Sequence, residues 1–332
     1  MHKIYDVYGI GNALVDLEYR VTEDFLREHG INKGMMTLVE QDAQQRLMQA
    51  LEARYGKPHQ ASGGSATNSV TALSNFGGRA FYSCKVASDP TGDFYMHDLH
   101  ASGVFSNLGH ERPAGISGTC VVMLTPDAER TMHTFLGITA DVSRHELVPE
   151  ALRAAHWLYI EGYLCTSPSA RDAVLEARRI AREAGTKIAM TFSDPAMVQF
   201  FKNEIDVMLD DGVDLLFCNE QEAMTWAGAD NVEAALEALK AKAGNIIITL
   251  GKDGALIWDG TTAVGVPVWP VTLVDTLGAG DMFAGASLYG VNQGWTLERA
   301  ARLGSRAAGA VVSRMGPRLA PEEHKPLLAD VQ

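Results

Sequence analysis

Short apolar segments alternate along the chain with longer segments in which apolar residues recur at helical spacing. The short segments are rich in β-branched and aromatic residues and predict buried strands at residues 5–10, 157–160, 187–192, 215–217 and 246–250. The longer ones predict helices at residues 42–55, 67–76, 170–184, 232–243, 281–292 and 297–313. This alternation predicts a three-layer α/β/α fold with a mostly parallel sheet, in which ligands bind at the carboxyl ends of the strands.

Two regions interrupt the alternation with half-polar strand patterns. One hairpin is predicted from residues 119–124 and 131–136, joined by a turn at 125–127. We expect a single domain over residues 1–332, with a small, discontinuous β lid formed by approximately 15–39 and 112–137. A lid suits phosphoryl transfer, because its closure keeps water away from the reacting groups.

Composition and charge exclude several classes of protein. The chain has 332 residues, of which 46% are hydrophobic, enough for a substantial core. A net charge of −13 argues against nucleic acid or an anionic membrane as a partner. The four cysteines lie far apart and form no CxxC pair, and no apolar run approaches the ~20 residues that cross a bilayer. We therefore expect a cytoplasmic protein.

A glycine-rich turn that ends in an acid precedes the helix predicted at 281–292. It consists of Gly278, Ala279, Gly280 and Asp281. Glycines let backbone N–H groups converge, and the helix adds the positive end of its dipole, so the turn favours phosphate. Asp281 could then take a proton from a hydroxyl that attacks the phosphorus. Alternatively, the small residues only allow close packing on a sheet, and the helix dipole alone favours the acid.

Polar residues also follow the first predicted strand. Asn12 and Asp16 suit hydrogen bonding to vicinal hydroxyls, whereas the structural alternative is an Asx turn with a surface acid. The same segment nearly matches the dinucleotide fingerprint GxGxxG, but Leu14 replaces the third glycine. A hydride-transfer enzyme with a Rossmann fold is therefore disfavoured.

A second glycine-rich segment precedes the helix predicted at 67–76. Gly63 and Gly64 would let a substrate approach the backbone, and Asn68 offers a donor and an acceptor to a sugar hydroxyl. An N-cap with a flexible entry is the structural alternative.

Two further sets of residues suit a nucleotide. Asn219 and Glu222 share one face of a helix start and could arrange water around a magnesium ion bound to phosphates, although helix capping predicts the same residue types. Ser305 and Gly309 would let a flat base lie along their helix, and close packing on the sheet explains them equally well.

These segments, in this order, resemble the signatures of the ribokinase-like (PfkB) family of carbohydrate and nucleoside kinases. The resemblance implies that Asp281 is the catalytic base and that the N–H groups of Gly278, Ala279 and Gly280 stabilise the transferring phosphoryl group. It also implies a magnesium role for Glu222, through water, beside Asn219. Residues 249–254 resemble the nucleotide-binding turn of the family, which places Thr249, Gly251 and Gly254 near ATP.

Within the family the chain most resembles adenosine kinases, over residues 11–16, 63–65, 68–69, 118–120, 159–164 and 219–223. By this resemblance Met36, Leu38, Leu136 and Tyr163 would sandwich a purine, and Arg130 would reach the γ-phosphate, with a solvated surface arginine as its alternative. Leu277 stands where adenosine kinases commonly have asparagine, and residues 135–139 differ from their lid sequence. These departures concern recognition of the acceptor.

The predicted function is transfer of the γ-phosphate of MgATP to a primary hydroxyl of a ribosyl substrate, such as the 5′-hydroxyl of adenosine. A kinase acting on ribose, fructose or a related sugar stays open, as does a non-catalytic regulator that binds a nucleoside or sugar. By family analogy a monovalent cation such as K⁺ could bind near the backbone of Asp275. A monomer and a homodimer are both compatible with the sequence.

Overall fold

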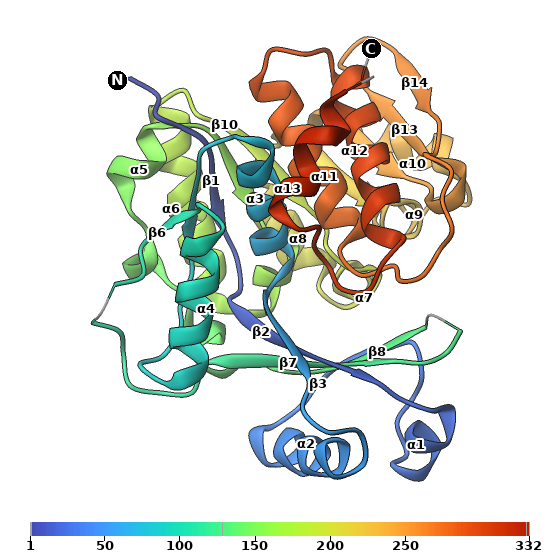
Figure 1. The fold of residues 1–332 in the computed structure, drawn as a ribbon. Coiled ribbons are helices and arrows are strands. Elements are labelled where there is room, and N and C mark those ends of the chain that lie inside the picture. Colours follow the sequence, from blue (N-terminus) through green and yellow to red (C-terminus); the bar gives the residue numbers. More distant parts are fainter. Residues whose placement is uncertain (1, 110, 128, 330, 332) are drawn as a thin grey trace.

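A large, mostly parallel sheet forms the centre of the molecule (Figure 1). The computed structural model describes residues 2–109, 111–127, 129–329 and 331. Within them the strands of this sheet follow the spatial order β14 (Ala263–Val266), β13 (Ala255–Trp258), β12 (Ala243–Thr249), β11 (Val213–Asn219), β10 (Lys187–Thr191), β9 (Ala155–Ile160), β1 (Tyr5–Ile10), β5 (Ala80–Ser83) and β6 (Phe105–Ser106). Among these described strands only the pairs β12–β13 and β13–β14 are antiparallel, so β13 alone runs against the others.

Helices cover both faces of this sheet. In β12, Ile246 and Ile248 join one hydrophobic core and Ile247 the other, because successive side chains of a strand point to opposite faces. The first face carries α5 (Pro149–Arg153), α6 (Pro168–Glu183), α7 (Pro195–Phe200), α8 (Lys202–Leu209), α9 (Glu220–Ala227) and α10 (Val232–Leu239). The second face carries α3 (Ser65–Phe76), α4 (Pro90–Ala101), α11 (Ala279–Asn292) and α12 (Leu297–Val312), with α13 (Pro321–His324) packed on α3. The predicted α/β architecture is confirmed.

A second, smaller sheet crosses beneath this body (Figure 1). Its described strands follow the order β3 (Met36–Leu38), β8 (Arg130–Phe135), β7 (Gly118–Leu124), β2 (Leu14–Arg20) and β4 (His59–Gly63). Strand β4 lies outside the two segments predicted for the lid, and residue 128 of the second segment lies outside the described residues. The smaller sheet is therefore built from three stretches of chain, since β4 pairs antiparallel with β2.

The helix predicted at 42–55 does not cover the main sheet. It forms α2 (Gln41–Tyr55), which packs on the smaller sheet, and α1 (Glu23–Glu28) lies on the same side (Figure 1). The buried side chain of Gln44 donates to the carbonyl oxygens of Thr119 and His133, at 2.9 and 3.0 Å, and accepts from the Thr119 hydroxyl. These bonds bind α2 to β7 and β8.

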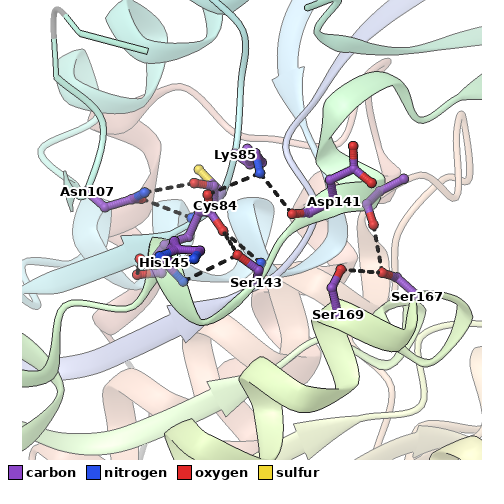
Figure 2. A network of polar contacts seen from close by, with 11 residues as sticks. Cys84, Lys85, Asn107, Asp141, Ser143, His145, Ser167 and Ser169 are labelled. Atoms are coloured by element: carbon purple, nitrogen blue, oxygen red, sulfur yellow. Dashed lines mark hydrogen bonds and ion pairs between the residues drawn. The ribbon is translucent and has the colours of Figure 1, made fainter. Parts of the chain in front are cut away.

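Polar contacts fix the chain where it returns from β8 to the body (Figure 2). The return passes through the short 3₁₀ helices η1 (Gly137–Asp141) and η2 (Arg144–Glu146). Lys85 donates to the Asp141 carbonyl oxygen at 3.0 Å and pairs with Glu146 at 3.4 Å, while Ser167 donates to the Ala140 carbonyl oxygen at 2.7 Å. One end of the smaller sheet is thereby anchored beside α6.

The predicted helix bounds agree with the structure to within two residues except at one place. The helix predicted at 232–243 ends at Leu239, because the chain from Ala243 onward pairs with β11 as strand β12. The longest helices, α6 and α12, have 16 residues each. Among the described residues no helix combines the length and the apolar character needed to traverse a lipid bilayer.

Candidate active site

The glycine turn before α11 opens into a cavity of about 460 Å³ between the two sheets. Gly278 is the N-cap of α11 and has φ 71°, and a Cβ there would fall 2.4 Å from the Pro317 carbonyl oxygen. The N–H groups of Gly278 and Gly280 have no protein acceptor among the described residues. They are free for an anion. The N–H group of Ala279, predicted to share this role, donates to the Thr276 carbonyl oxygen at 3.3 Å instead.

Asp281 lies in the first turn of α11 and lines the same cavity. Its carboxylate accepts hydrogen bonds from the Ser65 hydroxyl at 2.6 Å and from the Asn68 amide at 2.9 Å. Removal from bulk water raises the pKa of Asp281 to about 6, although these hydrogen bonds act in the opposite direction. The carboxyl group can therefore accept a proton near neutral pH.

Asn12 and Asp16 face this cavity from the start of the smaller sheet. The amide of Asn12 donates to Glu161 at 3.0 Å, and Glu161 also accepts the backbone N–H groups of Asn12 and Ala66. The Asp16 carboxylate has no hydrogen-bond partner within the described part of the chain, and burial raises its pKa to about 7. It is available to a hydroxyl of a ligand.

The two glycines of the second glycine-rich segment differ in position. Gly64 lines the cavity, and its contact with a substrate stays a prediction. Gly63 does not line it, because its backbone packs against the carboxylate of Asp16. The missing side chain of Gly63 leaves room for the Asp16 carboxylate and not for a substrate. This corrects the expectation of direct substrate contact.

Apolar side chains from the smaller sheet and from the main body line the cavity together. Met36 and Leu38 come from β3, Leu136 from the end of β8, and Tyr163 from the 3₁₀ helix η3 (Gly162–Thr166). Leu38 is 48% exposed, so its side chain is free to cover a ligand. The structure brings together all four residues predicted to contact a base.

Arg130 also lines this cavity and is 8% exposed, which rules out a solvated surface position. Its guanidinium pairs with the carboxylate of Asp275, which also accepts N–H groups from Leu277 at 3.0 Å and Gly316 at 2.9 Å. Two other guanidinium nitrogens of Arg130, Nε and Nη1, are buried without a partner among the described residues. The ion pair joins β8 to the loop that precedes α11.

The residues predicted for ATP divide into two groups. Asn219 and Thr249 line the cavity at the ends of β11 and β12. Ser305 does not line the cavity. Its hydroxyl donates to the Pro267 carbonyl oxygen at 2.8 Å. A Cβ at Gly309 would lie 3.1 Å from Trp269. The small residues of α12 thus accommodate the segment 267–269, which corrects the expectation of an open face for a base.

Gly251 and Gly254 stand outside the cavity as well. They flank a 3₁₀ turn after β12 and have φ values of 58° and 91°. The Gly254 carbonyl oxygen accepts the N–H group of Leu250 at 2.8 Å. Their conformation is explained by the turn itself.

Glu222 lines the cavity from the first turn of α9 but is only 4% exposed. Both carboxylate oxygens accept hydrogen bonds from Asn219, at 2.8 and 2.9 Å, in a capping box. Burial raises the pKa of Glu222 to about 8. No group of three or more His, Cys, Asp and Glu side chains in the described ranges is arranged to hold a metal ion. A direct protein cage for magnesium is therefore not present among these residues.

Several residues of the site have side chains without a predicted role, and for Asp275 only the backbone is predicted to lie near a monovalent cation. Ser65, Glu161 and Asp275 belong to segments that resemble the family signatures. That resemblance could have indicated that they lie in the site. Arg318 donates to Asn68 from the C-terminal segment at 2.8 Å. No spacing or motif in the sequence connects it to the site.

Residues 33–324 match the model of the pfkB family of carbohydrate kinases. The chain belongs to this family. The predicted resemblance is thereby confirmed, and family membership makes the protein a carbohydrate or nucleoside kinase, a class of phosphotransferases that generally uses ATP with Mg²⁺.

Known relatives include both nucleoside and sugar kinases. The structure of adenosine kinase from Sinorhizobium meliloti is 35% identical, covers 98% of this chain and 99% of its own, and superposes with a TM-score of 0.89. A probable sugar kinase from Rhizobium etli is 34% identical over the full length of both chains, with a TM-score of 0.91. Adenosine kinase 1 of Arabidopsis thaliana is 27% identical and covers 93% of this chain and 94% of its own. The pfkB kinase fold therefore extends over nearly the whole chain.

Proposed function

We propose that this pfkB kinase transfers the γ-phosphate of MgATP to a primary hydroxyl of a ribosyl substrate, most specifically the 5′-hydroxyl of adenosine, with AMP and ADP as products. The observation that carries the proposal is the position of Asp281. Its carboxylate shares one cavity with free N–H groups at the start of α11 and with Asp16, which has no partner among the described residues.

The roles of the residues follow from chemistry. Asp16 and Asn12 would hold the ribose hydroxyls and thereby place the 5′-hydroxyl near Asp281. Asp281 would accept the hydroxyl proton as the oxygen attacks, and the N–H groups of Gly278 and Gly280 would stabilise charge on the transferring group. Arg130 would add positive charge there through its unpartnered nitrogens.

Magnesium would come with the nucleotide. Its ligands would be phosphate oxygens and water, since Glu222 is held by Asn219 and lies at the cavity wall, where it would accept hydrogen bonds from that water. Bound Mg²⁺ supplies neutralisation of charge on the phosphates. The protein residues supply orientation and a proton acceptor.

A nucleoside is favoured over a free sugar by the apolar lining of the cavity. Met36, Leu38, Met132 and Leu136 add apolar surface to the lining of the cavity, which suits a flat base and offers a free pentose few hydrogen bonds. A sugar kinase acting on ribose or fructose is the second candidate, supported by the similarity to the Rhizobium etli protein. Closure of the smaller sheet over either acceptor, as a lid, belongs to the same proposal.

Release of ADP in the presence of adenosine, inosine, ribose or fructose tests the proposal. The highest kcat/KM is expected with adenosine. A higher value with ribose or fructose would replace the nucleoside by a sugar. Tight binding of a nucleoside without ADP release from any acceptor would indicate a regulator that only binds. Asp281→Asn serves as the control, because it should lower any ADP release that depends on this cavity about 100-fold or more.

A further inference from the structure

Asn68 connects the carboxylate of Asp281 to a guanidinium group. Its side-chain N–H donates to Asp281 at 2.9 Å, and its side-chain oxygen accepts from Nε of Arg318 at 2.8 Å. A guanidinium only donates and an ionised carboxylate only accepts, so the amide can satisfy both groups in one orientation alone. Arg318 thereby determines which end of the amide faces Asp281.

Arg318 is itself held in place on its other side. Its Nη1 atom donates to the Ser62 hydroxyl at 2.9 Å and to the Asp98 carboxylate at 3.2 Å. The Ser62 hydroxyl donates to that carboxylate as well. Arg318 is 14% exposed and therefore has little freedom to adopt another rotamer.

These hydrogen bonds form one continuous network from α4 to α11. Asp98 of α4 binds Arg318, which binds Asn68 of α3, which binds Asp281. We propose that Arg318 is a positioning residue for phosphoryl transfer, which acts through Asn68 to orient the carboxylate of Asp281 toward the attacking hydroxyl. The proposal rests on the proposed function, in which Asp281 is the base.

Loss of the guanidinium would release the amide. The amide of Asn68 would then be held at one end only and could rotate away from the carboxylate of Asp281. Loss of its hydrogen bond favours the protonated acid, which cannot accept a proton from the substrate. Since hydrogen bonds to charged groups are among the stronger ones, the expected loss of kcat is about 10- to 100-fold.

The charge of Arg318 favours the ionised form of Asp281, as the hydrogen bond from Asn68 does. Burial raises the pKa of Asp281, whereas the hydrogen bonds from Ser65 and Asn68 and the charge of Arg318 lower it. The other titratable groups that face Asp281 are Asp16, Tyr159, Glu161, Tyr163 and Glu222. None of these residues is substituted in a variant of Arg318. The charge of Arg318 also lowers the pKa of Asp16, so the titration of Asp281 has to be followed at its own resonance.

The test compares Arg318→Met and Arg318→Lys with Arg314→Met. Arg314 lies in the same segment and pairs with Glu323 at 2.7 Å, away from Asn68, so its variant controls for loss of a C-terminal ion pair. Arg318→Met should lower kcat with little change in the KM of ATP, and it should move the acid limb of the pH profile to higher pH. Arg318→Lys retains the charge and should leave that limb near its wild-type position. Arg314→Met should match the wild type in both.

A double-mutant cycle distinguishes a positioning role from a general structural one. If Arg318 acts through Asn68, then Arg318→Met should cost little more in the Asn68→Ala background, because the connection is already broken. Equal fold-losses in both backgrounds would overturn the proposal. If Arg318→Met does not fold, Arg318→Lys takes its place in the cycle, since lysine cannot reproduce the fork that serves Asn68 and Asp98 together.

A measurement without substrate separates this inference from the proposed function. In protein with ¹³C-labelled aspartate carboxyl groups, the resonance of Asp281 is identified by its disappearance in Asp281→Asn. It should titrate at higher pH in Arg318→Met than in the wild type, whichever acceptor the enzyme uses. An unchanged titration would refute the connection, whereas failure of every acceptor in the ADP assay would count against the proposed function alone.

Discussion

The backbone of Gly63 in β4 lies directly against the carboxylate of Asp16 in β2. A Cβ at position 63 would fall 2.3 Å from both carboxylate oxygens, a separation that side chains do not tolerate. Since Leu14 pairs with Gly63 in the register of the two strands, the contact is fixed by the sheet. The position of Asp16 therefore depends on the absence of a side chain at residue 63.

The first prediction concerns Gly63→Ala. The added methyl group should displace Asp16 and raise the KM of the acceptor about 10-fold or more, because one group that holds the ribose moves. The KM of ATP should stay within threefold. Steady-state kinetics with each substrate varied in turn provides the measurement. Gly244→Ala is the matched control, since its Cβ would lie 3.5 Å from the nearest atom, in ordinary contact; an equal effect in both variants would contradict the explanation.

Asp281→Asn should remove the proton acceptor while retaining the shape of the site. We expect kcat to fall about 10²- to 10⁴-fold, the range that general-base catalysis contributes. Binding of ATP and adenosine, measured by calorimetry, should change little. Asp259→Asn, in an exposed turn, should behave like the wild type. Wild-type turnover in Asp281→Asn would remove this residue from the mechanism.

Activity should decline on the acid side of neutrality. Burial raises the pKa of Asp281 to about 6 and that of Asp16 to about 7, and the proposed reaction needs both groups ionised. As pH falls through these values each group gains a proton, so kcat/KM for the acceptor should decrease below about pH 7 with a slope that approaches two below about pH 6. Asp16→Asn should reduce the limiting slope to one. A profile that stays flat down to pH 5 is incompatible with these roles.

Arg130→Met should affect both stability and catalysis. The substitution leaves Asp275 buried without its cation, which should destabilise the protein by about 3 kcal/mol in urea unfolding. Loss of positive charge near the transferring phosphate should also lower kcat about 10³-fold or more. Arg112→Met provides the comparison, because Arg112 is similarly buried and pairs with Asp93 away from the cavity. It should reduce stability without lowering kcat in the folded protein; comparable kcat losses would contradict the role of Arg130.

Local chemistry explains what could be predicted from the sequence. The isoleucines at 246–248 favour a strand buried on both faces, because their β-branched side chains then alternate between two hydrophobic cores. The turn at Gly278 and the carboxylate of Asp281 are likewise neighbours along the chain, so their relation survives any arrangement of the other elements. The fold class and the centre of the candidate site were accessible for this reason.

The remaining site residues meet only through tertiary structure. Arg318 and Asn68 are separated by 250 residues, and Asn12 and Glu161 by 149. Their contacts depend on how α3, the strand ends and the C-terminal segment pack, and a buried polar group takes whichever partner that packing brings near. The same packing decided that Gly63 serves Asp16 and that Ser305 and Gly309 face residues 267–269. The sequence by itself determined the fold class and the turn that carries Asp281, whereas the tertiary structure decided which side chains hold Asp281 in place, because such hydrogen bonds form between groups that only folding brings within about 3 Å.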